Sequence, residues 1–180
     1  ITDYRKKSYK VIVISSAMSG VTNELVKKSK EISEDFSNSE YDVLVSSGEQ
    51  VACSLIAGRL IHQGIKARSW LAWQIPIMTK GFYKNSRIEL INKSKIMKYI
   101  KEGGVPIIAG FQGINNLERV TTIGRGGSDA SAIMIAKFFK AQRCIIYTDV
   151  EGIYTTDPNK LNKAKKIKVI SYEEMLEMAS

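Results

Sequence analysis

The residues best suited to bind a ligand lie in one short glycine-rich stretch, residues 124–129 (GRGGSD). Glycines leave backbone N–H groups accessible, so that several of them can surround an anion at the start of a helix. Arg125 adds a planar guanidinium suited to a carboxylate or a phosphate, and Asp129 adds a counter-charge for an ammonium group. The stretch predicts a pocket for a zwitterionic amino acid. The alternative is a tight turn in which Arg125 pairs with a structural carboxylate.

Two other segments combine small residues with hydrogen-bonding groups. Residues 15–23 (SSAMSGVTN) offer hydroxyls on Ser16, Ser19 and Thr22, and Gly20 lets the backbone approach a ligand closely. Residues 148–158 (TDVEGIYTTDP) place Asp149 where it could serve a ribose, a phosphate-bound metal or a lysine, and Tyr154 where it could stack on a base. For the first segment a loop that merely turns into a helix is the alternative, and for Tyr154 it is packing in the core.

These segments follow short apolar runs, and the pattern predicts the elements that hold them. Buried strands are expected at residues 11–14, 105–111 and 144–148, and further strands at 65–71, 75–79 and 168–170. Helices are expected from Thr22 or Asn23 to about Phe36, and at residues 42–63 (with Gly64 ending the helix), 87–101, 130–139 and 171–178. Residues 115–122 are expected to form a hairpin or an excursion. This alternation predicts an α/β fold with a mostly parallel central sheet and helices on both faces. Ligands bind beyond the carboxyl ends of such strands.

Composition narrows the class of protein. A chain of 180 residues suits a single domain. The net charge of +9 comes from scattered lysines, which favours a solvated surface over a nucleic-acid site. Cys53 and Cys144 lie far apart and there is one histidine, so zinc binding is disfavoured and a reducing cytoplasm is expected. The apolar runs are too short to span a bilayer.

Six segments, in this order, resemble the aspartate kinases of the amino acid kinase family: SSAMSGVTN (15–23), SSGEQV (46–51), AGFQG (109–113), TTIGRGGSD (121–129), YTDVEGIYTTDP (147–158) and SYEEMLEMAS (171–180). The resemblance implies an αβα sandwich, with residues 1–180 forming part of a single catalytic domain. It implies transfer of a phosphoryl group from Mg–ATP to the β-carboxylate of L-aspartate, the entry step to lysine, diaminopimelate, threonine and methionine. SGEQ followed by AGFQG favours aspartate over the acceptors of related kinases.

The resemblance also implies roles for individual residues. Arg125 is expected to clamp a substrate carboxylate, Glu49 and Asp129 to face the ammonium group, and Arg125 and Asp129 to be the catalytic residues. Around aspartate it places Thr22, Glu49, Phe111, Arg125, Ser128 and Asp129. Along ATP it places Thr148, Asp149 and Tyr154, together with Asn159 and Lys160, where the family usually has an arginine at position 159. No metal-binding side chains are expected, and Mg²⁺ accompanies ATP.

The family usually opens with a Lys-Phe-Gly-Gly-Thr-Ser segment and carries a second phosphate-facing lysine after the terminal helix. Neither is found in this sequence, which starts at Ile1 and stops at Ser180. We therefore expect a domain that is incomplete at both ends and lacks the family's regulatory domains. Two alternatives stay open: a truncated, catalytically impaired remnant that keeps only ligand binding or dimerisation, and another family member with a different acceptor. The expected partners are L-aspartate and a possible homodimer, with no nucleic acid and no membrane.

Overall fold

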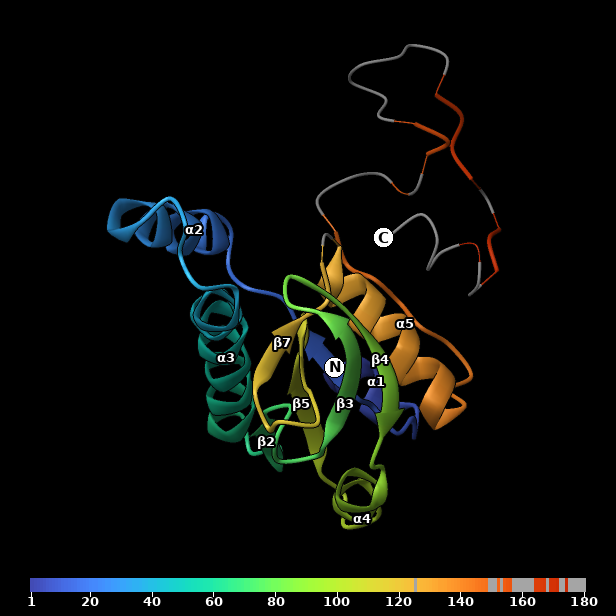
Figure 1. Ribbon diagram of the computed structural model, residues 1–180. Coiled ribbons are helices and arrows are strands. Elements are labelled where there is room, and N and C mark those ends of the chain that lie inside the picture. Colours follow the sequence, from blue (N-terminus) through green and yellow to red (C-terminus); the bar gives the residue numbers. More distant parts are fainter. Residues whose placement is uncertain are drawn as a thin grey trace.

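A three-stranded parallel sheet lies between helices, next to a second, four-stranded sheet (Figure 1). The structure is a computed structural model that describes residues 1–124, 126–148, 152, 154–156, 164–167, 169–171 and 174. The parallel sheet has the order β1 (Val13–Ser15), β5 (Val105–Ala109) and β2 (Ala67–Trp70). The second sheet has the order β4 (Asn85–Ile91), β3 (Ile77–Phe82), β6 (Gln112–Ile114) and β7 (Val120–Thr122). The helices are α1 (Thr2–Lys6), α2 (Val21–Ile32), α3 (Asn38–His62), α4 (Ser94–Lys101) and α5 (Gly127–Phe139).

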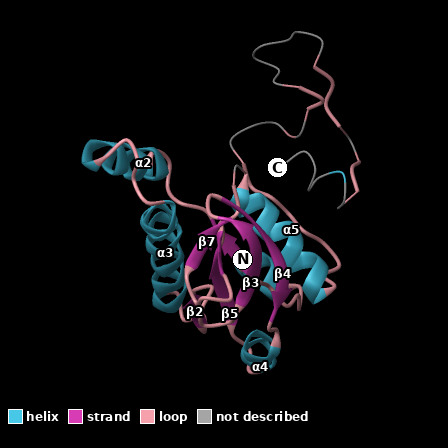
Figure 2. Cartoon of the chain, viewed as in Figure 1, coloured by secondary structure: helices cyan, strands magenta, loops and turns pink. Residues whose placement is uncertain are grey.

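Strand β5 is the centre of the core, because all five of its residues are buried. Its Ile107 and Ala109 pack against α3, in a cluster that includes Cys53 and Leu60. Ile108 points the other way, into a cluster formed by isoleucines of the second sheet, α4 and α5. β-branched residues fit a strand that is covered on both faces. Helices therefore cover both faces, with α3 on one side and α5 on the other (Figure 2), which confirms the predicted α/β fold with a parallel sheet.

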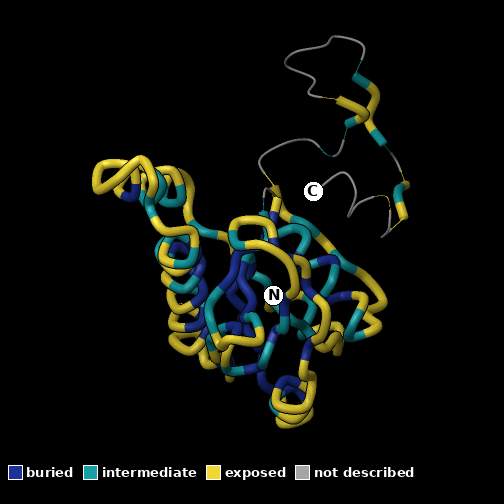
Figure 3. Tube along the Cα trace, in the orientation of Figure 1, coloured by how far each residue is buried: buried dark blue, intermediate teal, exposed yellow. Residues whose placement is uncertain are grey.

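Helix α3 carries most of the buried polar residues discussed below. It begins four residues earlier than expected, with Ser37 as the N-cap residue, so the polar segment at 37–40 forms its first turn. It ends at His62, one residue before the expected end, and Gly64 follows with a φ of +74°. There the Ile65 N–H donates to the Leu60 carbonyl at 2.9 Å and the Gly64 N–H donates to the Ile61 carbonyl at 2.9 Å. This is the Schellman arrangement, which glycine accommodates without steric cost. The inner side of α3 is buried, whereas α2 is largely exposed (Figure 3).

The predicted helix at residues 87–101 is wrong in its first half. Residues Asn85–Ile91 form β4, and the helix is confined to Ser94–Lys101. Ile88 and Ile91 are three residues apart, a spacing that suggests a helix, but both are buried from a strand that pairs antiparallel with β3. The chain turns back after Phe82, so that β4 lies beside β3 and pairs with it. This pairing outweighs the helical spacing of the two isoleucines.

The predicted strand at residues 144–148 is also wrong. This segment is irregular, with Ile145 47% and Tyr147 81% exposed. An apolar run becomes a strand only where a neighbour completes its ladder of hydrogen bonds. At 168–170, Val169 and Ile170 form no strand, and Lys168 lies outside the described residues. A hairpin is present, as one of the two predicted alternatives, but it begins earlier than expected, because β6 pairs antiparallel with β7 from Gln112 onward.

The start of the last predicted helix is a capping box. The Glu174 N–H donates to the Ser171 hydroxyl at 3.2 Å, and the Glu174 carboxylate accepts from the Ser171 N–H at 2.9 Å. Each of the two side chains thus accepts a hydrogen bond from the backbone N–H of the other residue, which satisfies two N–H groups at the first turn of the helix. Within the described residues, every helix is too short or too polar to cross a lipid bilayer.

Candidate active site

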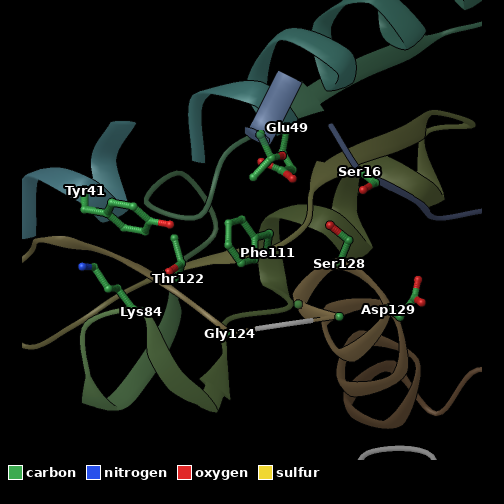
Figure 4. Close-up of a pocket in the computed structure, with 12 residues that line it drawn as sticks. Ser16, Tyr41, Glu49, Lys84, Phe111, Thr122, Gly124, Ser128 and Asp129 are labelled. Carbon is green, nitrogen blue, oxygen red and sulfur yellow. The ribbon is translucent and has the colours of Figure 1, made fainter. Parts of the chain in front are cut away.

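A pocket of about 400 Å³ opens where β1 and β5 end, at the carboxyl edge of the parallel sheet. Figure 4 shows side chains from α3, from the turn between β3 and β4 and from the start of α5 gathered around it. The lining residues are Ser16, Thr22, Tyr41, Glu49, Lys84, Phe111, Thr122, Gly124, Gly126, Gly127, Ser128 and Asp129. The structure thus brings together Thr22, Glu49, Phe111, Ser128 and Asp129, which the resemblance placed around one ligand.

The remaining predicted site residues are not part of this pocket or cannot be placed. Arg125, Asp149, Asn159 and Lys160 lie outside the described residues. Thr148 and Tyr154 are described but do not line the pocket. Tyr154 instead forms an isolated antiparallel bridge with Lys166.

Glu49 is a buried carboxylic acid with one oxygen left for a ligand. Its side chain, on α3, belongs to a residue that is only 3% exposed. Oε1 accepts the N–H of Ala17 at 3.2 Å, while Oε2 is buried and has no hydrogen-bond partner among the described residues. Burial raises the pKa of Glu49 to about 7. In Figure 4 the carboxyl group points into the pocket beside Phe111. Such a group can accept a hydrogen bond from an ammonium ion, which would complete its bonding.

Phe111 is held in a left-handed conformation, with a φ of +62°, between β5 and β6. Its N–H donates to the Ser131 hydroxyl at 2.9 Å, and that hydroxyl donates to the Gly127 carbonyl at 2.6 Å. A Cβ atom at Gly127 would lie 2.3 Å from the Phe111 ring. The aromatic wall of the pocket therefore rests on the first turn of α5, and only glycine leaves room for it. Strained backbone of this kind persists where surrounding contacts hold it in place.

Helix α5 begins at Gly127, three residues before the predicted start at Ala130, so the end of the glycine-rich stretch forms its first turn. Gly124 and Gly126 have φ values of +63° and +65°, and Gly126 is the N-cap residue of α5. Ser128 and Asp129 lie in the first turn, where backbone N–H groups point out of the helix and favour a negatively charged partner. Burial raises the pKa of Asp129. The start of α5 thus offers both backbone N–H groups for an anion and an acidic side chain to the same pocket.

Four residues at the other end of the pocket were missed by the sequence analysis. The fully buried Asp42 accepts hydrogen bonds from the Lys84 N–H and from both the N–H and the hydroxyl of Thr122. The Lys84 ammonium lies 4.3 Å from the centre of the Tyr41 ring. Burial, and then the charge of Asp42, raise the pKa of Tyr41. One signal was available: Asp42 precedes Glu49 by seven residues, which is two helical turns and places both on one face.

The described part of the chain has no cluster of side chains suited to bind a metal ion. No group of three or more His, Cys, Asp or Glu side chains lies close enough together there to hold a metal ion. The pocket is built from hydroxyls, carboxylates, a lysine, two aromatic rings and a helix start.

The sequence is similar to curated aspartokinases. The aspartokinase of Rickettsia conorii is 52% identical over 178 residues, which are 97% of this chain and 44% of that protein. The chain thus spans less than half the length of this relative.

Solved structures with the same fold include two aspartate kinases. Aspartokinase III of E. coli, in complex with aspartate and ADP, superimposes with a TM-score of 0.77 at 26% identity, covering 87% of this chain and 46% of that chain. Aspartate kinase from Synechocystis gives a TM-score of 0.76 at 36% identity, covering 99% of this chain and 29% of that chain. The sequence model of the amino acid kinase family matches residues 1–180, the whole chain. With sequence and fold in agreement, the chain belongs to the amino acid kinase family.

Proposed function

We propose that this chain is part of an aspartate kinase, which transfers the γ-phosphoryl group of Mg–ATP to the β-carboxylate of L-aspartate. The observation that carries the proposal is the half-satisfied carboxyl group of Glu49, buried in a pocket that also contains Thr22, Phe111, Ser128 and Asp129. The relatives named aspartokinase, one of them solved with aspartate and ADP, support the same substrates.

In this proposal the ammonium group of aspartate binds to Glu49, with Asp129 adding a second negative charge. The Glu49 oxygen that lacks a partner would gain one, and the buried carboxylate would gain a counter-ion. Both effects favour the ionised acid over the neutral one. A glutamine at position 49 would carry a neutral amide, which could not supply the negative charge.

The carboxylate groups of aspartate bind to the hydroxyls of Thr22 and Ser128 and to the free N–H groups at the start of α5. A helix start attracts anions through its free N–H groups and its dipole. Arg125, next to this turn in the sequence, is proposed to add a bidentate clamp on one carboxylate.

Mg–ATP is proposed to bind along the segment that contains Thr148, Asp149, Tyr154, Asn159 and Lys160, and Mg²⁺ enters as part of this substrate. An oxygen of the β-carboxylate attacks the γ-phosphorus, ADP leaves, and aspartyl phosphate forms. In such a transfer the protein chiefly aligns the two substrates and balances charge. The product would supply the synthesis of lysine, diaminopimelate, threonine and methionine in the cytoplasm.

Calorimetric titration of the protein with L-aspartate, L-glutamate and ATP tests the proposal. L-Aspartate should bind more tightly than L-glutamate, because a pocket shaped for one carboxylate spacing misplaces the longer chain. Equal affinity for the two amino acids would contradict the proposed acceptor.

The substitution Arg125→Lys sharpens this test. It keeps the charge but removes the bidentate geometry, so affinity for aspartate should fall about tenfold while affinity for ATP stays within about twofold. The matched control is Arg119→Lys, since Arg119 forms a partly exposed ion pair with Glu40 away from the pocket. The control should bind aspartate like the wild type, and an equal loss in both variants would argue against the clamp.

A further inference from the structure

Asp42 connects three separate parts of the pocket, although it does not line the pocket itself. Both of its carboxylate oxygens accept the Lys84 N–H at 3.0 Å. The same carboxylate accepts the N–H of Thr122 at 2.8 Å and the hydroxyl of Thr122 at 2.8 Å. The residue is fully buried on α3, so these bonds form without competition from water. One carboxylate thus joins α3, β7 and the turn between β3 and β4.

The turn that Asp42 holds is strained and reaches the glycine-rich stretch. Lys84 has a φ of +66°, a conformation that side chains with a Cβ rarely adopt. Next to it, the Asn85 amide oxygen would lie 2.8 Å from a Cβ at Gly124. The turn therefore packs closely on the segment that leads into α5, which carries Ser128 and Asp129. Strain at a pocket wall is a reason to look for a functional role.

The same carboxylate also sets the pocket wall relative to Glu49. Asp42 and Glu49 are two helical turns apart on α3. Thr122 and Lys84, which donate hydrogen bonds to Asp42, line the same pocket as Glu49. Figure 4 shows Thr122 and Lys84 on the side of Tyr41, across Phe111 from Ser128 and Asp129. The Asp42 bonds therefore link the helix that carries Glu49 to the part of the pocket formed by Lys84 and Thr122.

We propose that Asp42 is a positioning residue for the amino acid substrate: by holding Lys84 and Thr122 it fixes the β3–β4 turn against the glycine-rich stretch and thereby sets the width of the pocket. The inference rests on the proposed function and assigns the acceptor specificity of that site to a residue that does not touch the substrate. A mispositioned turn weakens the fit of the amino acid and leaves the nucleotide segment unaffected.

The test uses Asp42→Asn in the protein as its gene encodes it, with steady-state kinetics of aspartyl phosphate formation. Asparagine has one acceptor oxygen and an NH₂ group that cannot accept, so some of the bonds to Lys84 or Thr122 are lost. The KM for L-aspartate should rise about tenfold or more, while the KM for ATP changes less than about twofold. An unchanged KM for aspartate would overturn the inference. A wild type that shows no aspartate-dependent turnover would instead overturn the proposed function, and this inference with it.

A matched control separates positioning from stability. Thr79 and Thr121 share a buried hydroxyl hydrogen bond of 2.6 Å between β3 and β7, and neither lines the pocket. Thr79→Val removes this bond and should lower the melting temperature, as Asp42→Asn does, without raising the KM for aspartate. If Thr79→Val raises that KM as much as Asp42→Asn, the role of Asp42 is merely structural.

A rescue experiment tests the route through residue 84. Glycine adopts a positive φ without steric cost, so a turn with Lys84→Gly no longer needs the Asp42 carboxylate to hold it. In the Lys84→Gly background, Asp42→Asn should raise the KM for aspartate by about threefold or less. An undiminished tenfold effect would show that Asp42 does not act through the turn.

A second pair keeps the inference testable if Asp42→Asn fails to fold. Thr122→Val removes the hydroxyl that donates to Asp42 and keeps the shape of the side chain, whereas Thr122→Ser keeps the hydroxyl. Thr122→Val should raise the KM for aspartate several-fold above that of Thr122→Ser. Equal values for the two variants would overturn the inference.

Discussion

At the scale of single residues, the buried carboxyl group of Glu49 should make ligand binding depend on pH near neutrality. Its pKa of about 7 means that the ionised form becomes dominant only above that pH. Binding of an ammonium group requires the ionised form, so the affinity for aspartate should rise about tenfold between pH 6 and pH 8. Calorimetric titrations at the two pH values measure this change. Glu49→Gln should bind weakly at both, and an unchanged pH dependence in that variant would remove Glu49 from the proposal.

The same carboxyl group should affect stability in the opposite direction. The folded-state pKa of about 7 lies above the ordinary value of 4.5, so the folded protein holds the proton more tightly than the unfolded chain does. The stabilisation is complete below about pH 4.5 and is lost as pH rises through 7. Denaturant unfolding should therefore show Glu49→Gln gaining up to about 3 kcal/mol relative to wild type between pH 4 and pH 8. The variant Glu102→Gln, at a partly exposed surface ion pair, should leave this pH dependence in place.

The site residues that the sequence predicted and those that it missed differ in the kind of contact that gives them a role. Glu49, Phe111 and Ser128 stand in segments whose residue types and family resemblance point to a ligand. Asp42 and Lys84 act only through a contact between positions that are 42 residues apart in the sequence. No local pattern encodes such a contact, and the function of a buried aspartate emerges only when the fold brings its donors together.

At the scale of elements, the junction between the Phe111 ring and the start of α5 should be intolerant of even one added methyl group. In Gly127→Ala the new Cβ would lie 2.3 Å from the ring, so the ring or the helix must move. The variant should lose about 1–3 kcal/mol of stability and bind aspartate less tightly, because the pocket wall shifts. Chemical denaturation and titration calorimetry measure the two effects.

The control for this substitution lies on α3. A Cβ at Gly58, which is exposed in the helix, would meet no atom within 4 Å. Alanine is the better helix former, so Gly58→Ala should gain up to about 1 kcal/mol and leave binding unchanged. A stable Gly127→Ala that binds aspartate normally would mean that Phe111 does not depend on this glycine.

The elements themselves were predictable where local pattern and tertiary environment agree. β5 is apolar and buried on both faces, and α3 has both a helical pattern and a glycine stop. β4 was mistaken for a helix and residues 144–148 for a strand, because strand formation depends on a partner elsewhere in the chain. The existence of the second sheet could not be deduced from segments read one at a time.

At the scale of the whole molecule, the pocket is lined by residues from Ser16 to Asp129, so a bound ligand connects segments from most of the described chain. L-Aspartate at about one hundred times its dissociation constant should stabilise the folded state by about 2.7 kcal/mol. For a chain of this size that corresponds to a rise in melting temperature of about 5–10 °C, measurable by scanning calorimetry. Succinate, which lacks the ammonium group, should give a much smaller rise, and an equal rise would contradict the role of Glu49.

Three predictions concern parts and partners beyond the described residues, and they stay predictions. The first is that the chain forms part of a single catalytic domain. The others are a possible homodimer and a reduced activity of a chain of this length. The sequence predicted the parallel sheet and its covering helices because these follow from periodicity and apolar runs.

The two-turn spacing of Asp42 and Glu49 on α3 constrains how the sequence can change length during evolution. Inserting or deleting one residue between them would rotate one carboxylate by about 100° around the helix axis relative to the other. Either the pocket would lose Glu49 or the β3–β4 turn would lose its anchor. The connection at residues 33–37, which is exposed apart from Phe36, carries no such restriction. Insertions and deletions among descendants of this gene should therefore accumulate in that connection and be excluded from the interval between the two acids.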